Sequence, residues 1–200
     1  MNMYWLVLII AGYLLGSILF CRILPKVLKN VDVTAMSADG NPGAANVFTV
    51  AGWELGLICL AFDMAKGFFP VFLAVRFLET TDWRFALVFI APVLGHAFSC
   101  FNGFKGGKCI STMFGEVIAL FPISPVGLVL AALYILFSTF VKINPHRKRS
   151  ILTFSIFIPL AVGINLALGE LATAAGCAAA AAIAIIKHCM DRTGISEKAA

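Results

Sequence analysis

The sequence predicts an all-α protein, a polytopic membrane bundle of about seven transmembrane helices in a single membrane domain that covers residues 1–200. Hydrophobic residues make up 61% of the chain and charged residues only 12%, whereas an ordinary soluble domain is about half apolar and a quarter charged. Apolar runs recur along the whole chain, bounded by proline, glycine or charge. Since one crossing of the bilayer needs about 20 helical residues, the chain has room for about six or seven crossings and none for a soluble domain.

The apolar runs give the expected position of each span. The first is expected to be a retained span, because Met1 to Trp5 lacks the basic stretch of a cleavable signal peptide. The fourth is short and contains Glu116, which indicates a broken or tilted helix buried in protein or lining a cavity. The last carries mostly small residues over 172–184, which favours close helix contact. The spans are expected near residues 4–23, 52–78, 84–101, 109–121, 125–141, 151–168 and 170–189.

Lysine and arginine are distributed unevenly between the connecting segments. Most of the 15 basic residues follow the first, third, fifth and last spans, whereas the turns at 79–82, 121–125 and 165–170 have none. The positive-inside rule then predicts an amino terminus outside the cell and a carboxyl terminus in the cytoplasm. The net charge of +5 therefore reflects membrane topology, and nucleic acid is not indicated as a partner.

The composition of reactive residues excludes several kinds of site. The six cysteines form no CxxC pair and fall mostly within apolar runs, where cysteine acts as a small hydrophobe. The three histidines are far apart in sequence and no HxxxH spacing occurs, so no metal site is expected. No Walker pattern is present, so no nucleotide is expected.

A glycine-rich loop over residues 39–46 leads into the second span. Its sequence, DGNPGAAN, contains Gly40, Asn41, Gly43 and Asn46. Successive backbone N–H groups in such a loop can surround an anion. A plain turn with a helix cap explains the same residues equally well, since Asn and Asp tolerate unusual backbone angles.

A charged pair interrupts the second span. Asp63 and Lys66 are three residues apart and therefore share one helical face. A lipid-facing position would cost about 2.5–3.5 kcal/mol for each charge. The pair is therefore expected to face the bundle interior or a polar cavity, as site residues or as an ion pair that clamps helices.

The most informative stretch is residues 95–108, GHAFSCFNGFKGGK. Gly106 and Gly107 are expected to free the backbone, while Lys105 and Lys108 supply positive charge for a phosphate. His96 is expected where the third span meets this loop. The alternative is an interfacial loop whose lysines only follow the positive-inside rule.

Two later segments carry further polar residues near the expected membrane surface. They contain His146, Ser150, His188 and Asp191. Residues of this kind beside a span are most often topological anchors or contacts to lipid headgroups.

Four motifs together resemble the PlsY family of acyl-phosphate:glycerol-3-phosphate acyltransferases. They are GSI at 16–18, DGNPGAAN at 39–46, DMAKG at 63–67 and GHAFSCFNGFKGGK at 95–108. Their order and spacing match the family pattern over residues 16–115, and the rest of the chain matches loosely. The resemblance implies seven helices, no cofactor and no metal, and an acyl group passed from a fatty acyl phosphate to glycerol 3-phosphate. The product would be lysophosphatidic acid, made for phospholipid synthesis at the bacterial cytoplasmic (inner) membrane, with membrane lipid as the other partner.

The resemblance also implies roles for individual residues. Lys108 would neutralise phosphate, and His188 and Ser150, which look like parts of the family's HxxN and RxxS elements, would position the acceptor; these three are the expected catalytic residues. We further predict that segments 39–46, 63–67 and 95–108 converge on one cavity open to the cytoplasm. The expected substrate-binding residues are Gly40, Asn41, Gly43, Asn46, Asp63, Lys66, His96, Lys105, Gly106 and Gly107.

The chain departs from the family pattern where phosphate would be held. Asp39 replaces a serine, Thr49 replaces an arginine and Asp191 replaces an asparagine. A lost arginine and two added carboxylates weaken anion binding. Glycerol 3-phosphate is therefore expected to bind weakly unless an arginine from another loop reaches the pocket, the candidates being Arg147, Arg149 and Arg192.

Two other functions fit the same residues. A non-catalytic PlsY-like protein could bind acyl phosphate or an anionic lipid and regulate a partner. A small transporter could use Asp63 and Lys66 as a coupling pair. The transporter is disfavoured because polar residues gather on one expected side of the membrane and no inverted repeat is visible.

Overall fold

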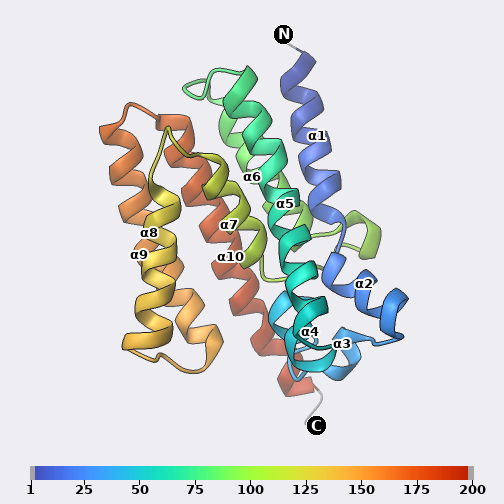
Figure 1. Ribbon diagram of the computed structural model, residues 1–200. Helices are drawn as coiled ribbons and strands as arrows, with labels where there is room; N and C mark the ends of the chain where they lie inside the picture. Colours follow the sequence, from blue (N-terminus) through green and yellow to red (C-terminus); the bar gives the residue numbers. More distant parts are fainter. Residues whose placement is uncertain (1–2, 198–200) are drawn as a thin grey trace.

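The computed structural model describes the backbone of residues 3–197 and the side chains of residues 3–190. Helices and their connections account for this whole range, and no strand occurs within it (Figure 1). The helices are α1 Met3–Ser17, α2 Phe20–Lys29, α3 Val33–Met36, α4 Ala44–Val50, α5 Trp53–Phe77, α6 Arg84–Ala97, η1 Cys100–Asn102, α7 Ile110–Ala119, α8 Val126–Ile135, η2 Leu136–Phe140, α9 His146–Ala167 and α10 Leu171–Glu197.

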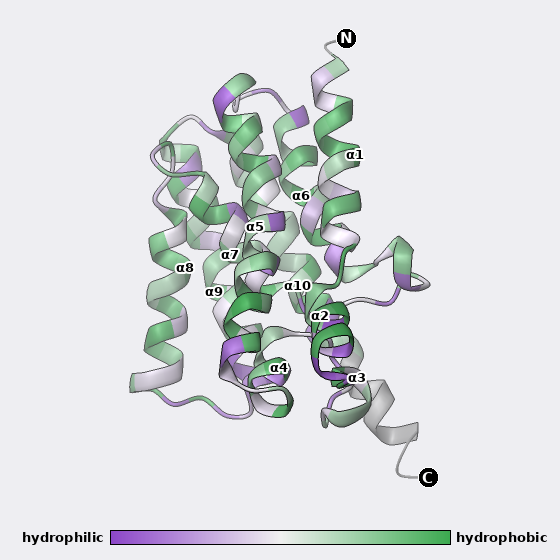
Figure 2. Cartoon of the chain, turned by 45° about the vertical axis from the view of Figure 1, so that its right-hand side comes forward, coloured by the Kyte–Doolittle hydropathy of each residue, from purple (hydrophilic) through white to green (hydrophobic). Residues whose placement is uncertain are grey.

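Every apolar run that predicts a span forms a helix, but the helices differ in length. Four are long and apolar enough to cross a bilayer, namely α5, α6 with η1, α9 and α10. The pair α1 and α2, bent by 44°, would make a fifth, while α7 and the helix over Val126–Phe140 are shorter. Hydrophobic residues cover most of these helices, as Figure 2 shows. The predicted all-α membrane bundle is therefore confirmed.

The predicted first span, 4–23, is not one continuous helix. Helix α1 ends at Ser17 and the chain turns into α2, where the basic residues Arg22, Lys26 and Lys29 share a short helix with exposed Val27 and Leu28. The Ile18 carbonyl at this bend accepts a hydrogen bond from the Lys66 Nζ, at 2.7 Å. In a continuous helix this carbonyl would accept a hydrogen bond from the backbone of the same helix. Here it accepts one from a buried ammonium group on α5 instead.

The predicted sixth span, 151–168, begins too late. Helix α9 starts at His146, directly after Pro145, and includes the basic residues up to Ser150. Proline just before a helix fixes a backbone angle suited to its start. The charged turn that the sequence suggests is a loop is therefore the first turn of a helix.

Glycines permit close contacts between helices of the bundle. A Cβ atom placed on Gly115 of α7 would lie 1.9 Å from the Met64 carbonyl oxygen of α5. A Cβ atom on Gly67 of α5 would lie 2.1 Å from the Thr112 carbonyl oxygen of α7. The short α7 is thus packed directly against the backbone of α5. Its Glu116 is fully buried, as expected for a short span surrounded by protein.

The two ends of the bundle differ in what they carry. Figure 1 shows the amino terminus at one end, together with the turns after α5, α7 and α9. Helices α3 and α4, the start of α9 and the end of α10 lie at the opposite end. A small apolar cluster that includes Cys21, Val33, Val47 and Cys59 packs α2, α3 and α4 onto α5 there. This packing fixes the loop before α4 against the bundle.

Candidate active site

The glycine-rich loop is held by its own side chains. The Asp39 Oδ1 accepts hydrogen bonds from the Asn46 Nδ2 at 2.7 Å and from the Asn41 backbone N–H at 3.2 Å. The Asn46 amide also donates to the Asn41 carbonyl at 2.8 Å. Gly40 has a positive φ of 62°, a conformation that glycine adopts without strain. The loop is therefore ordered before any ligand binds.

Lys108 closes over this loop. Its Nζ lies 2.6 Å from the Asp39 Oδ2, and the two side chains are 13% and 34% exposed. Partial burial acts to raise the pKa of Asp39, but the hydrogen bonds from Lys108 and Asn46 outweigh it, so the pKa lies below its usual range. Asp39 is thus a carboxylate that Lys108 neutralises, rather than an isolated charge that repels phosphate.

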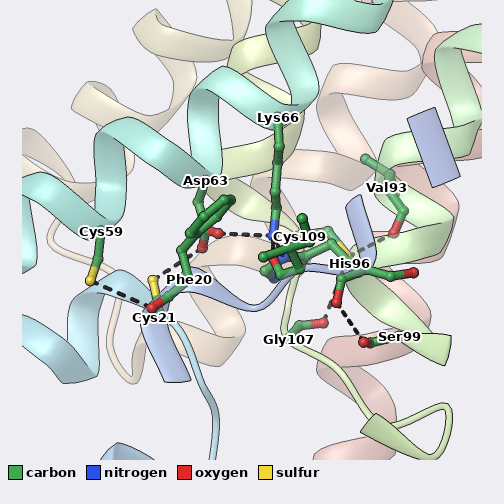
Figure 3. Close-up of polar contacts among 12 residues, drawn as sticks. Phe20, Cys21, Cys59, Asp63, Lys66, Val93, His96, Ser99, Gly107 and Cys109 are labelled. Carbon is green, nitrogen blue, oxygen red and sulfur yellow. Dashed lines mark hydrogen bonds and ion pairs between the residues drawn. The ribbon is translucent and has the colours of Figure 1, made fainter. Parts of the chain in front are cut away.

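Asp63, Lys66 and His96 form a buried polar cluster between α5 and α6. The Lys66 Nζ lies 2.8 Å from the Asp63 Oδ1, 2.8 Å from the His96 Nδ1 and 2.7 Å from the Ile18 carbonyl oxygen (Figure 3). An ammonium group has three N–H donors, and these three acceptors use them all. Because Lys66 donates to Nδ1, the His96 ring is neutral and carries its proton on Nε2.

Gly106 and Gly107 serve close packing rather than an unusual backbone angle. A Cβ on Gly106 would lie 1.9 Å from the His96 carbonyl oxygen, and one on Gly107 would lie 2.3 Å from the His96 Nε2. The Gly107 N–H also donates to that carbonyl, at 3.0 Å. Neither glycine has a positive φ. The expectation that they free the backbone is therefore wrong, and they bring the Lys108 loop against His96.

One cavity of about 320 Å³ lies among these segments, at the lower end of the range for small-molecule sites. The predicted convergence of segments 39–46, 63–67 and 95–108 is observed, because each lines this cavity. Apolar residues from α4, α5 and α7 line it as well, so the space has both polar and apolar walls. Its lining is Asp39, Asn41, Gly43, Ala44, Ala45, Asn46, Phe48, Leu60, Asp63, His96, Lys108, Cys109, Ile110, Ser111, Tyr134, His146 and Arg149.

The remaining wall comes from α8 and α9, far along the chain from the glycine-rich loop. Tyr134, His146 and Arg149 line the cavity there. The His146 Nδ1 lies 3.0 Å from the Ser150 Oγ, so the buried Ser150 lies behind His146. No local pattern in the sequence marks Tyr134, and His146 lies in a segment of the kind that most often only anchors a span at the membrane surface.

Several expected site residues lie outside the cavity lining. Lys66 is buried behind Asp63, and Lys105 is exposed on the loop after η1. His188 is buried in α10, where its Nδ1 lies 2.7 Å from the Ala184 carbonyl oxygen. Gly40, Gly106, Gly107 and Ser150 likewise do not line the cavity.

Of the other residues expected near the acceptor phosphate, the structure describes the side chain of Arg147. Arg147 donates to the carbonyl oxygen of His188 in α10, at 2.5 Å, and does not line the cavity. The side chains of Asp191 and Arg192 lie outside the described residues. Within residues 3–190, no group of three or more His, Cys, Asp and Glu side chains is placed to hold a metal ion.

A helical membrane bundle with a charged cavity, partly walled by apolar side chains, defines an integral membrane protein built to hold an amphipathic or anionic small molecule. A family model described as glycerol-3-phosphate acyltransferase matches residues 6–196. The chain belongs to this family.

Relatives in several bacteria carry the same family name. The glycerol-3-phosphate acyltransferase of Maridesulfovibrio salexigens is 33% identical over 176 residues, which cover 87% of this chain and 86% of that protein. The enzyme so named in Pseudomonas aeruginosa is 37% identical over 158 residues, or 79% and 80% of the two chains. Glycerol-3-phosphate acyltransferase 2 of Thermotoga maritima is 42% identical, but the match spans only 59% of each chain.

Solved structures match nearly the whole fold. The crystal structure of PlsY (YgiH), described as an integral membrane glycerol 3-phosphate acyltransferase, has a TM-score of 0.81 in its glycerol 3-phosphate form and 29% sequence identity. The lysophosphatidic acid form of that protein gives a TM-score of 0.80. Both matches cover 97% of this chain and 92% of the other.

Proposed function

We propose that this protein transfers a fatty acyl group from acyl phosphate to glycerol 3-phosphate and releases lysophosphatidic acid. The observation that carries the proposal is the cavity where the glycine-rich loop, Asp63, His96 and Lys108 meet. Family membership and the glycerol 3-phosphate and lysophosphatidic acid forms of PlsY support the choice of substrate and product.

The reaction suits a site made of positive charge and polar backbone. The acceptor hydroxyl oxygen forms a bond with the acyl carbonyl carbon, the bond from that carbon to the phosphate oxygen breaks, and the hydroxyl proton ends on the released phosphate. Phosphate is already a good leaving group, so the protein mainly has to hold two anions together and place the hydroxyl near the carbonyl. In the proposal, Lys108 exchanges Asp39 for a substrate phosphate.

The expected residues divide into two groups in this proposal. Those that line the cavity, such as Asn41, Asn46 and Lys108, contact the substrates. Those that lie behind it, such as Lys66 and Ser150, hold His96 and His146 in place. His188 has an indirect role in this proposal. Its carbonyl oxygen accepts a hydrogen bond from Arg147 of α9, the helix that carries His146 and Arg149.

The test is to incubate the purified full chain with palmitoyl phosphate and a panel of acceptors that includes glycerol 3-phosphate, and to identify products by mass. We expect lysophosphatidic acid and inorganic phosphate in equal amounts. Failure to form an acylated product with any acceptor would contradict the proposal.

The Asp39–Lys108 ion pair gives a specific reason to keep a non-catalytic alternative. A carboxylate already fills the place on Lys108 that a phosphate would take. In that alternative the protein binds acyl phosphate without consuming it. Binding of palmitoyl phosphate with no loss of the compound over time would favour it.

A further inference from the structure

Arg149 places a positive charge on the cavity wall opposite the glycine-rich loop. It lies in the first turn of α9 and lines the cavity with His146 and Tyr134. Its Nε is buried and has no hydrogen-bond partner among the described residues. None of the ion pairs within residues 3–190 involves its guanidinium group. A buried N–H donor without a partner is costly unless a ligand or water meets it.

The other positive charges near the cavity are committed to protein groups. Lys108 pairs with Asp39, and the Lys66 Nζ is used by three acceptors behind the cavity. Arg147 donates to the carbonyl oxygens of His188 and Cys189. The cation that faces the cavity without a carboxylate partner, among the residues described, is Arg149.

Position 49, where the PlsY pattern has an arginine, does not supply this charge. Thr49 is exposed, does not line the cavity, and donates its hydroxyl to the Ala45 carbonyl at 3.1 Å. Arg149 reaches the same cavity from the other side. His146, Lys108 and Asp39 line this cavity together with Arg149, so charged or titratable side chains lie on both walls.

The geometry points to Arg149 as the residue that binds the phosphate of the acceptor and selects a phosphorylated alcohol over a neutral one. This inference rests on the proposed acyl transfer to glycerol 3-phosphate. The planar guanidinium group presents paired N–H donors that match two phosphate oxygens. Bound in this way, the acceptor lies between α9 and the glycine-rich loop, with its hydroxyl directed into the cavity.

Steady-state kinetics of Arg149→Ala test the inference, with Lys148→Ala as the matched control. Lys148 is the exposed neighbour on the same helix and does not line the cavity. For Arg149→Ala we expect the KM for glycerol 3-phosphate to rise about ten- to a hundred-fold, the loss that a charge-assisted contact implies. The KM for palmitoyl phosphate should not change, and Arg149→Lys should recover part of the loss. Lys148→Ala should match the wild type in both constants.

Three results would overturn the inference. They are an unchanged KM for glycerol 3-phosphate in Arg149→Ala, an equal rise in the KM for palmitoyl phosphate, and the same effect in Lys148→Ala. Direct binding of radiolabelled glycerol 3-phosphate to the wild type and to Arg149→Gln, without acyl phosphate, separates this inference from the proposed function. Weaker binding by Arg149→Gln supports the site even if the wild type makes no product, and equal binding refutes it even if the wild type is active.

Discussion

The Lys108 side chain is held by a carboxylate that comes from another part of the chain. Its contact with Asp39 joins the glycine-rich loop to the loop before α7, and both side chains keep some exposure to solvent. An ion pair in such a setting contributes about 0–1 kcal/mol, so a doubly charged phosphate can compete for the lysine. The pair therefore orders the site without blocking it.

Lys108→Ala should abolish most of the activity while the protein still folds and inserts. One preorganised charge at the reacting centre is worth about 10²- to 10³-fold in kcat. Lys105→Ala is the comparison, since this lysine lies on the same loop but is exposed and outside the cavity lining. Acyl transfer measured at saturating substrates should fall only in the first variant. Turnover near that of the wild type in Lys108→Ala would make this lysine merely a topological anchor.

Thr49→Arg and Asp39→Ser should differ in their effect on the KM for glycerol 3-phosphate. In our inference Arg149 supplies the positive charge that the PlsY pattern has at position 49. Thr49→Arg should therefore change the KM for glycerol 3-phosphate little. Asp39→Ser should lower that KM by up to about five-fold, since it frees Lys108 from a partner worth at most about 1 kcal/mol. Initial rates over a range of acceptor concentrations measure both. A large improvement in Thr49→Arg alone would show that the acceptor phosphate lies near α4 instead.

At the scale of elements, the contact between α5 and α7 determines where the site residues lie. Gly67 and Gly115 let the two backbones touch, and this contact places the start of α7, with Lys108 just before it, beside Asp63. Helix α7 has only ten residues. Its position therefore depends on tight packing more than on its length in the bilayer.

Gly115→Ala should destabilise the protein. The added Cβ would lie 1.9 Å from the Met64 carbonyl oxygen, and overpacking of this kind costs about 1–3 kcal/mol or more. Gly163→Ala is the control, because that glycine lies within α9 with nothing within 4 Å of the added atom. It should be neutral or stabilise by about 0.5–1 kcal/mol. Thermal unfolding in detergent should show a lower midpoint for Gly115→Ala and an unchanged or higher midpoint for Gly163→Ala, and equal midpoints for the two variants would contradict the close α5–α7 contact.

For the whole molecule, the distribution of charge predicts which end of the bundle faces the cytoplasm. The basic start of α9 and the loop before α4 lie at one end, and the basic-poor turns lie at the other with the amino terminus (Figure 1). The positive-inside rule places the first end, and with it the cavity, in the cytoplasm. This orientation is our proposal for a bacterial inner membrane.

Labelling with a membrane-impermeant thiol reagent in intact cells tests the orientation. Thr81→Cys and Lys148→Cys would each be made in a chain that carries Cys100→Ser and Cys189→Ser, since these two cysteines are not buried. Both introduced positions are exposed and lie in segments at opposite ends of the bundle. Cysteine at 81 should react in intact cells, and cysteine at 148 only after permeabilisation. The reverse pattern would place the cavity outside the cytoplasm.

Some residues of the site could be predicted from short stretches of sequence, and others could not. The motif residues Asn41, Asn46, Asp63, His96 and Lys108 could be predicted because short-range patterns mark them. Tyr134 carries no such pattern, and Arg149 could be named only as one of three candidate arginines. Whether a side chain lines a cavity depends on helix packing between segments about a hundred residues apart, which no local periodicity records.

The sequence by itself determined the all-α membrane bundle, the approximate positions of its apolar helices and the segments that carry charge. It did so because the cost of polar groups in lipid acts on every stretch of the chain separately. Only the tertiary structure decided that the first helix ends at Ser17 and leaves the Ile18 carbonyl to Lys66, that Asp39 neutralises Lys108, and that Arg149 rather than Arg147 lines the cavity. Each of these depends on the distance between atoms remote in sequence, and close packing of the helices sets that distance.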